Sequence, residues 1–189
     1  MTKDELVELL EASGRTDDLK SALKQDRAKV RLRGVAGSAY AFLAAEVIKK
    51  SNDHHLFVLS DQEAAAYFLS DLELLMGKKK VLFYPMSYRR PYELEDTDNS
   101  NVIQRGEVLN ALQASTSQQL IVTYSKALTE KVISKKTLRK STFGVNVGDE
   151  IDLDFINEML YEFHFERVDQ VYEPGQFAIR GGIVDIFSF

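Results

Sequence analysis

The sequence predicts an α/β protein in which a parallel-sheet domain is followed by an α+β domain with a β-hairpin. From residue 29 to residue 76, short apolar runs alternate with longer helical stretches, which is the pattern of βαβ units in a parallel sheet. Toward the C-terminus, two extended segments flank Glu173-Pro174-Gly175. Proline followed by glycine at the centre of such a segment is typical of a tight turn.

The composition predicts a folded protein whose default partner is another protein. Of the 189 residues, 44% are hydrophobic and 28% are charged, values close to the averages of globular domains. The formal net charge of -5 disfavours electrostatic binding of phosphate groups over a broad surface. The absence of cysteine excludes disulfides and thiolate metal sites and is compatible with the cytoplasm, the compartment we expect. The sequence has no apolar run of about 18 residues and no export signal, so no membrane contact is expected.

Helices and strands are expected in alternation along the first domain. Residues 3–24 predict two short helices interrupted by Gly14. The pattern that follows predicts strands at 29–34, 56–59, 81–84 and 120–123 and helices at 39–50, 62–76 and 102–112. The last three strands are continuous apolar runs, so we expect all three to be buried on both faces at the centre of the sheet. Ser60 or Asp61 is expected to cap the helix at 62–76, and residues 85–100 are expected to form a loop.

The second domain is expected to begin with a helix and to continue as a hairpin. Residues 153–163 carry the apolar stripe of a helix, and Asp152 is its predicted N-cap. Extended segments at 165–172 and 176–187 then form the predicted hairpin around the Pro-Gly turn.

A glycine pair interrupts the last extended segment. The apolar alternation before Gly181-Gly182 resumes on the opposite parity after it, which predicts a β-bulge that re-aims Arg180. A domain that ends on an apolar strand is expected to continue in strands beyond Phe189 that cover its edge. The predicted organisation is a helical flank at 1–25, a sheet domain at 26–126 and the start of a second domain at 127–189.

The segment from Leu32 to Phe42 has the setting of a phosphate-binding P-loop, because it follows a predicted strand and opens a helix. Its chemistry is missing. Three residues stand where the motif has glycine, lysine and the magnesium-binding hydroxyl: Ala39, Tyr40 and Ala41. A tyrosine cannot neutralise the β- and γ-phosphates as the lysine does.

We therefore expect a degenerate domain of the RecA or P-loop type, whose loop residues bind no nucleotide: Gly34, Gly37, Ser38, Ala39, Tyr40 and Ala41. A glycine-containing turn with no relation to a P-loop is the alternative interpretation. No catalytic residue and no metal site is expected, because the three histidines lack a metal-ligand spacing and lie beside no obvious nucleophile.

A basic run contains Glu130 as its one acid and six cations: Lys126, Lys131, Lys135, Lys136, Arg139 and Lys140. A solvated connecting segment is the first interpretation, and a contact with an anionic partner such as nucleic acid is the second.

Three segments resemble known DNA-repair families. LRGVAGSAYAFLAAEVI, residues 32–48, resembles the P-loop segment of the excision-repair protein UvrB without its nucleotide chemistry. YEFHFERVDQVYEPGQFAIRGGIVDIFSF, residues 161–189, is similar to a segment shared by UvrB and the transcription-repair coupling factors. Residues 81–112 resemble the coupling factors more closely, since the segment is short and acidic where UvrB has a longer, aromatic DNA-probing hairpin.

The resemblance implies the N-terminal UvrB-like module of a coupling factor, with no catalytic activity or cofactor of its own. By resemblance, this module recruits UvrA, with Arg180, Gly181 and Gly182 in the contact, and Arg180 donates to a carboxylate. The parent protein would use ATP and magnesium in its C-terminal part to translocate on DNA and displace stalled RNA polymerase. A UvrB-like ATPase and DNA-binding subunit is the alternative.

Overall fold

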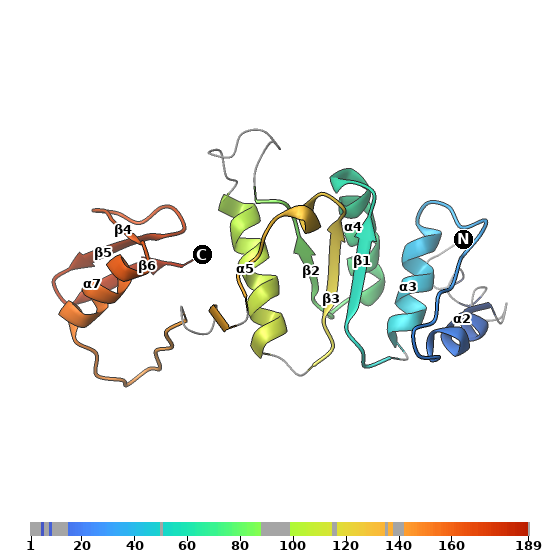
Figure 1. Ribbon diagram of the computed structural model, residues 1–189, viewed down its shortest axis with the longest axis horizontal. Helices are drawn as coiled ribbons and strands as arrows, with labels where there is room; N and C mark the ends of the chain where they lie inside the picture. The colour runs from blue at the N-terminus through green and yellow to red at the C-terminus, as the bar shows by residue number, and fades with distance from the viewer. Residues whose placement is uncertain are drawn as a thin grey trace. The chain divides into compact units, whose positions relative to one another are not determined.

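A computed structural model describes residues 5, 8, 15–49, 51–87, 99–114, 117–134, 136–137 and 142–188. The chain divides into two compact units, one made of Met1–Pro85 with Ala114–Ala127 and the other of Met86–Gln113 with Leu128–Phe189. One unit holds a parallel sheet, and the other holds a separate mixed sheet with a hairpin (Figure 1). This architecture confirms the predicted fold class.

The first unit is built around a three-stranded parallel sheet in the order β1-β3-β2. Its described elements are α2 (Arg15–Leu23), α3 (Ala39–Lys49), β1 (His55–Leu59), α4 (Gln62–Met76), β2 (Val81–Tyr84) and β3 (Leu120–Tyr124). Helix α4 packs on the sheet through Phe68, whose ring centroid lies 5.1 Å from that of Phe57 on β1. The helices and strands predicted between residues 39 and 123 are confirmed, with small shifts at their ends.

The three strands are not equally buried. Every residue of β3 is buried, and the Thr123 hydroxyl donates a hydrogen bond of 2.7 Å to the backbone carbonyl of Tyr84 on β2. On β1, Leu56 is 57% exposed and Val58 is 48% exposed. In the order β1-β3-β2 only β3 is central among the described strands, so the prediction that all three lie at the centre is wrong for both β1 and β2, although β2 is largely buried. An apolar run identifies a strand but does not give its place in the sheet.

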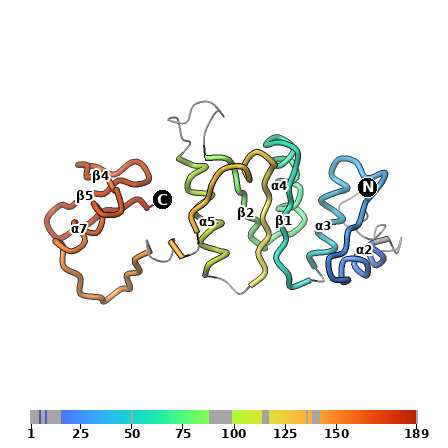
Figure 2. The backbone as a smooth tube through the Cα atoms, viewed as in Figure 1, coloured from blue at the N-terminus to red at the C-terminus, as the bar shows by residue number. Residues whose placement is uncertain are grey.

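No strand forms at residues 29–34, so that prediction is wrong as well. Figure 2 shows this segment as irregular blue backbone between α2 and α3. Val30 and Leu32 are 41% and 42% exposed. The residues that alternate with Val30 and Leu32 are Lys29, Arg31 and Arg33. A central strand of a parallel sheet would bury these cations without partners.

Of the two residues predicted as the cap of α4, Asp61 is the cap. The Asp61 carboxylate accepts a hydrogen bond of 2.9 Å from the backbone N–H of Ala64, and the Ser60 hydroxyl donates to the same carboxylate at 2.7 Å. The two residues predicted as alternatives therefore act together, one as the cap and the other as its support.

The second unit contains most of α5 (Asn99–Ala114), then α7 (Leu153–Glu162), β4 (Glu166–Arg167), β5 (Gln176–Arg180) and β6 (Ile183–Phe187). The short 3-10 helix η1 (Ala127–Thr129) lies at the boundary of the units. Asp152 caps α7 by accepting from the Asp154 N–H at 2.8 Å, as predicted. Leu160 of the predicted apolar stripe is 2% exposed.

The glycine pair is a hairpin turn and not a bulge. Strands β5 and β6 are antiparallel, and Gly181-Gly182 is the two-residue connection between them. Gly181 has a φ of 61°, which matches the positive φ required at the first position of a type II′ turn. The predicted bulge is therefore wrong, and Arg180 is instead the last residue of β5.

The register explains the change of phase that suggested a bulge. Across a two-residue turn, facing residues have opposite parity, as Phe177 faces Ile186 and Ile179 faces Val184. All four apolar side chains consequently lie on one face of the hairpin. The phase change was the signature of the turn itself.

The turn at Glu173-Pro174-Gly175 is confirmed, because Gln176 N–H donates to the Glu173 carbonyl at 3.2 Å and Gly175 has a φ of 83°. It does not join an antiparallel pair, since β4 runs parallel to β5. The Gln176 side-chain oxygen accepts from the N–H groups of Tyr172 and Glu173, at 3.0 Å each. These two N–H groups donate to a side chain and not to a neighbouring strand. The predicted strand at 165–172 is accordingly only two residues long.

Some predictions fall on residues outside the described part of the chain. They are most of the first helix in 3–24, the greater part of the loop at 85–100, three cations of the basic run, Lys135, Arg139 and Lys140, and the terminal Phe189. None of the described helices is both long enough and apolar enough to cross a membrane.

Candidate functional site

The P-loop-like segment keeps the backbone shape of a loop that turns into a helix. Gly34 and Gly37 have φ values of 75° and 55°, which glycine adopts without strain. The Ser38 carbonyl accepts from the N–H groups of Ala41 and Phe42, at 2.9 and 3.2 Å, and thereby starts α3. The local geometry therefore agrees with the predicted turn.

The lysine position of the motif offers no cation to a phosphate in this segment. Tyr40 is 47% exposed and stands where the motif has lysine, and Ala39 is exposed beside it. Ala41, at the position of the magnesium-binding hydroxyl, is fully buried within the helices of the first unit. A side chain that is buried in the core cannot present a ligand to a metal ion in an open site.

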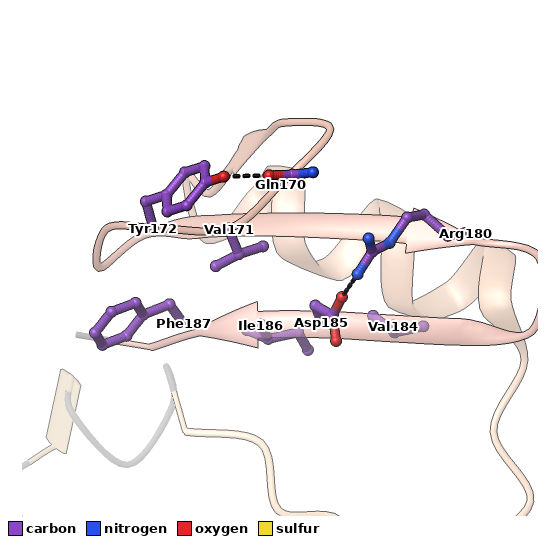
Figure 3. A pocket seen from close by; sticks show the side chains of 8 residues that line it. All are labelled: Gln170, Val171, Tyr172, Arg180, Val184, Asp185, Ile186 and Phe187. Atoms are coloured by element: carbon purple, nitrogen blue, oxygen red, sulfur yellow. Dashed lines mark hydrogen bonds and ion pairs between the residues drawn. The ribbon is translucent and has the colours of Figure 1, made fainter.

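The hairpin of the second unit carries the other predicted site residue. Arg180 ends β5, and its guanidinium Nη2 donates to the Asp185 carboxylate Oδ2 on β6 (Figure 3). Arg180 faces Ile183 directly across the turn, and Asp185 lies diagonally on the same face of the hairpin. The Arg180 and Asp185 side chains are 57% and 41% exposed, so water and a partner can both reach the pair.

An open pocket of about 620 Å³ lies beside this pair. Its walls combine Arg180 and Asp185 with Tyr172, Ile186 and Phe187. Figure 3 shows the Tyr172 hydroxyl directed to the Gln170 side chain, with which it is hydrogen bonded. Charged, aromatic and aliphatic groups therefore border one hollow, as they do at many protein interfaces.

A second pocket, of about 430 Å³, lies on the other side of the arginine. It is lined by Arg167, Tyr161 and Ile179 as well as Arg180. Arg180 is thus shared by both pockets. The sequence interpretation missed Arg167, Tyr172 and Asp185, although Arg167 and Asp185 lie within the segment that carries the resemblance.

Gly181 and Gly182 lie exposed next to Arg180 in the hairpin turn. A Cβ atom added to either glycine would meet no atom within 4 Å. The pair therefore leaves the space beside the arginine open, and its conformational role is concentrated at Gly181, whose φ is positive.

Glu130, the one acid of the basic run, has its partners outside the run. Glu130 accepts from the Ser87 N–H at 2.9 Å and also from the Ser87 hydroxyl, and it pairs with Arg105 at 3.5 Å. This acid is therefore engaged inside the second unit. Lys131 and Lys136 are exposed.

Comparisons with known proteins show what the chain is similar to. Residues 143–189 match the UvrB interaction domain. Over 175 residues, or 91% of its length, the chain is 27% identical to a transcription-repair-coupling factor of Bacillus subtilis, of which it spans 15%. It is 27% identical over 85% of its length to the coupling factor of Myxococcus xanthus, of which it spans 14%. It is 26% identical over 82% of its length to UvrABC system protein B of Thermosipho africanus, of which it spans 25%.

The match to the interaction domain contains the hairpin, its turn and both sides of the Arg180–Asp185 pair. The similarity to the coupling factors and UvrB proteins also covers most of the chain, including the degenerate loop region. The chain is therefore similar over most of its length to the transcription-repair coupling factors and to UvrB proteins, and its residues 143–189 match the UvrB interaction domain.

Proposed function

We propose that this chain is a docking module of a nucleotide-excision-repair protein and that it binds UvrA through the face of the hairpin that carries Arg180. The observation that carries the proposal is the place of Arg180, which is exposed, shared by two pockets and inside the matched interaction domain. Gly181 and Gly182 lie exposed beside Arg180 in the turn and are proposed to belong to the same surface.

The chemistry of this face suits an acidic partner surface. A guanidinium presents five N–H donors in a planar fork and keeps its charge at any relevant pH. Arg167 adds a second exposed cation in the adjoining pocket, and Ile183, 63% exposed, adds an apolar contact directly opposite Arg180. An arginine anchor surrounded by such groups is the usual composition of an interface hot spot.

We further propose that the module is not catalytic and holds no cofactor. A bound triphosphate at the loop would meet backbone amides and the dipole of α3 but not the lysine of the motif, because Tyr40 occupies that position. The unit with the parallel sheet then serves as a scaffold for the interaction domain at residues 143–189.

The parent protein is proposed to be a transcription-repair coupling factor rather than UvrB. The loss of all three P-loop positions supports this choice, since the UvrB segment that residues 32–48 resemble carries the glycine, the lysine and the hydroxyl of the motif. In this proposal, other regions of the parent carry out ATP-driven translocation on DNA and displace stalled RNA polymerase. The chain spans only 15% and 14% of the two coupling factors to which it is similar.

The direct test is binding of UvrA to the chain by isothermal titration calorimetry, with Arg180→Ala and a matched control, Arg33→Ala. Arg33 is also an exposed arginine but lies in the other unit. We expect Arg180→Ala to weaken binding at least tenfold, because loss of such an anchor costs about 2 kcal/mol. Arg33→Ala should bind as the parent does. Equal affinities for all three proteins would remove Arg180 from the interface.

The alternative function, a UvrB-like ATPase, is supported by the similarity to UvrB proteins. Titration with a fluorescent ATP analogue and magnesium separates the two proposals. We expect no saturable binding at micromolar nucleotide, and saturation in that range would favour the ATPase. Gel-shift assays with DNA at about 150 mM salt test the basic run, since screening at that salt should abolish binding by a weak cationic patch.

A further inference from the structure

The pair of Arg180 and Asp185 joins the two strands of the hairpin at the place where UvrA is proposed to dock. The residues lie on one face, and their side chains meet above the strands, as Figure 3 shows. Both belong to the lining of the larger pocket. This inference rests on the proposed function and concerns how the same surface is prepared for its partner.

The contact occupies only part of the guanidinium. The hydrogen bond runs from Nη2 to one oxygen of the carboxylate, Oδ2. Each Nη atom carries two hydrogens, so one contact at Nη2 leaves a complete two-donor edge of the fork for a second carboxylate. A partner can therefore bind Arg180 in bidentate fashion while Asp185 stays in place.

The pair is poorly suited to stabilising the fold. Both side chains are well exposed, and ion pairs between exposed groups contribute little because water screens them and ordering two side chains costs entropy. A free arginine side chain, by contrast, samples many rotamers, and a partner that binds it must restrict them. A contact that restricts the arginine beforehand removes part of that cost.

We propose that Asp185 is a positioning residue for the docking of UvrA. It holds the Arg180 guanidinium between the two pockets with one edge free, so that the partner meets an ordered donor pair. The opposite role, in which Asp185 competes with the carboxylate of the partner and masks the arginine, predicts tighter binding when Asp185 is removed. The two roles therefore differ in the sign of one measurement.

The experiment measures UvrA affinity by calorimetry for the parent chain and for Asp185→Ala, Asp185→Asn, Arg180→Ala and the double variant. We expect Asp185→Ala to weaken binding about five- to tenfold, within the range of coupling between contacting residues. Asp185→Asn keeps an acceptor oxygen and should recover part of the loss. In the Arg180→Ala background, Asp185→Ala should have no further effect.

Thermal melting of each variant separates positioning from folding, since Asp185→Ala should melt within a few degrees of the parent. Unchanged or tighter binding by Asp185→Ala overturns the positioning role, and so does an equal loss in the presence and absence of Arg180. If Arg180→Ala binds UvrA as the parent does, Arg180 is not part of the interface and the proposed docking face fails. A normal Arg180 effect with no Asp185 effect refutes the positioning role alone.

Discussion

The ring of Phe177 meets the ring of Tyr161 edge to face, with centroids 5.5 Å apart and planes at 84°, and the contact joins β5 to α7. Phe177 is fully buried, whereas Tyr161 is 51% exposed. The helix therefore covers the apolar face of the hairpin, and Arg180 and Asp185 lie on the opposite face. The docking surface depends on this contact for its support.

Replacing Phe177 by alanine should destabilise the second unit by about 3–5 kcal/mol, the usual cost of deleting a buried aromatic ring. Tyr161→Ala is the matched control and should cost less, on the order of 1 kcal/mol, because its ring is half exposed. Hydrogen exchange of the β5 and β6 amides measures the opening of this unit separately from the sheet domain. Equal losses in the two variants would contradict a core role for Phe177.

The glycine pair gives a second matched comparison. Gly181 has a φ of 61°, whereas Gly182 lies outside the left-handed region, and a methyl group meets no atom at either position. Gly181→Ala should therefore cost about 1–2 kcal/mol through backbone strain alone. Gly182→Ala should be close to neutral. Denaturant unfolding followed by circular dichroism checks both, and a larger loss at Gly182 would contradict the assigned turn.

Local signals in the sequence predicted the helices and the caps. The bounds of α4 and the caps Asp61 and Asp152 follow from periodicity and from side chains a few residues away, so the structure confirms them. The absent strand at 29–34 and the edge position of β1 depend on pairing with distant segments, which periodicity does not encode.

The candidate site shows the same limit. Arg180 was predicted from the resemblance, but its pairing with Asp185 depends on the register across Gly181-Gly182. Interpreting that glycine pair as a bulge placed the two residues on one strand and hid their contact. Parity counting across the pair would have predicted the hairpin, since the phase change occurs where a two-residue turn requires it.

Acid should weaken the cap of α4. The pKa of Asp61 lies below its ordinary value of 3.8, because the carboxylate accepts from the Ala64 N–H and from the Ser60 hydroxyl. A carboxyl whose folded pKa is lowered stabilises the protein above its unfolded pKa, and this contribution is lost as the pH falls through the lowered folded value. Asp61→Asn keeps the cap without the charge.

The melting temperatures of parent and Asp61→Asn test this directly. The parent should melt above Asp61→Asn at pH 5, and the difference should shrink as the pH is lowered below 3.8. A difference that stays constant over this range would show that the charge of Asp61 adds nothing to its role as a cap.

His55 should make the first unit sensitive to mild acid. Burial lowers its pKa below 6.5, with Lys79 and His54 acting in the same direction and Asp53 opposing them. Its Nε2 atom is buried and makes no hydrogen bond among the described residues. Near pH 6.5 the unfolded chain therefore binds a proton at His55 that the folded chain does not bind. The contribution of neutral His55 to stability is complete above that pH and falls as the pH decreases toward the lowered folded pKa.

His55→Phe removes the titrating group and keeps a ring beside Phe57, with which His55 is stacked at 6.1 Å. Its stability should depend less on pH than that of the parent between pH 7 and the folded pKa. Asp53→Asn should lower the pKa of His55 further, because it removes the charge that favours the imidazolium. NMR titration of the His55 ring protons measures that shift, and a pKa that rises in Asp53→Asn would contradict the assigned electrostatics.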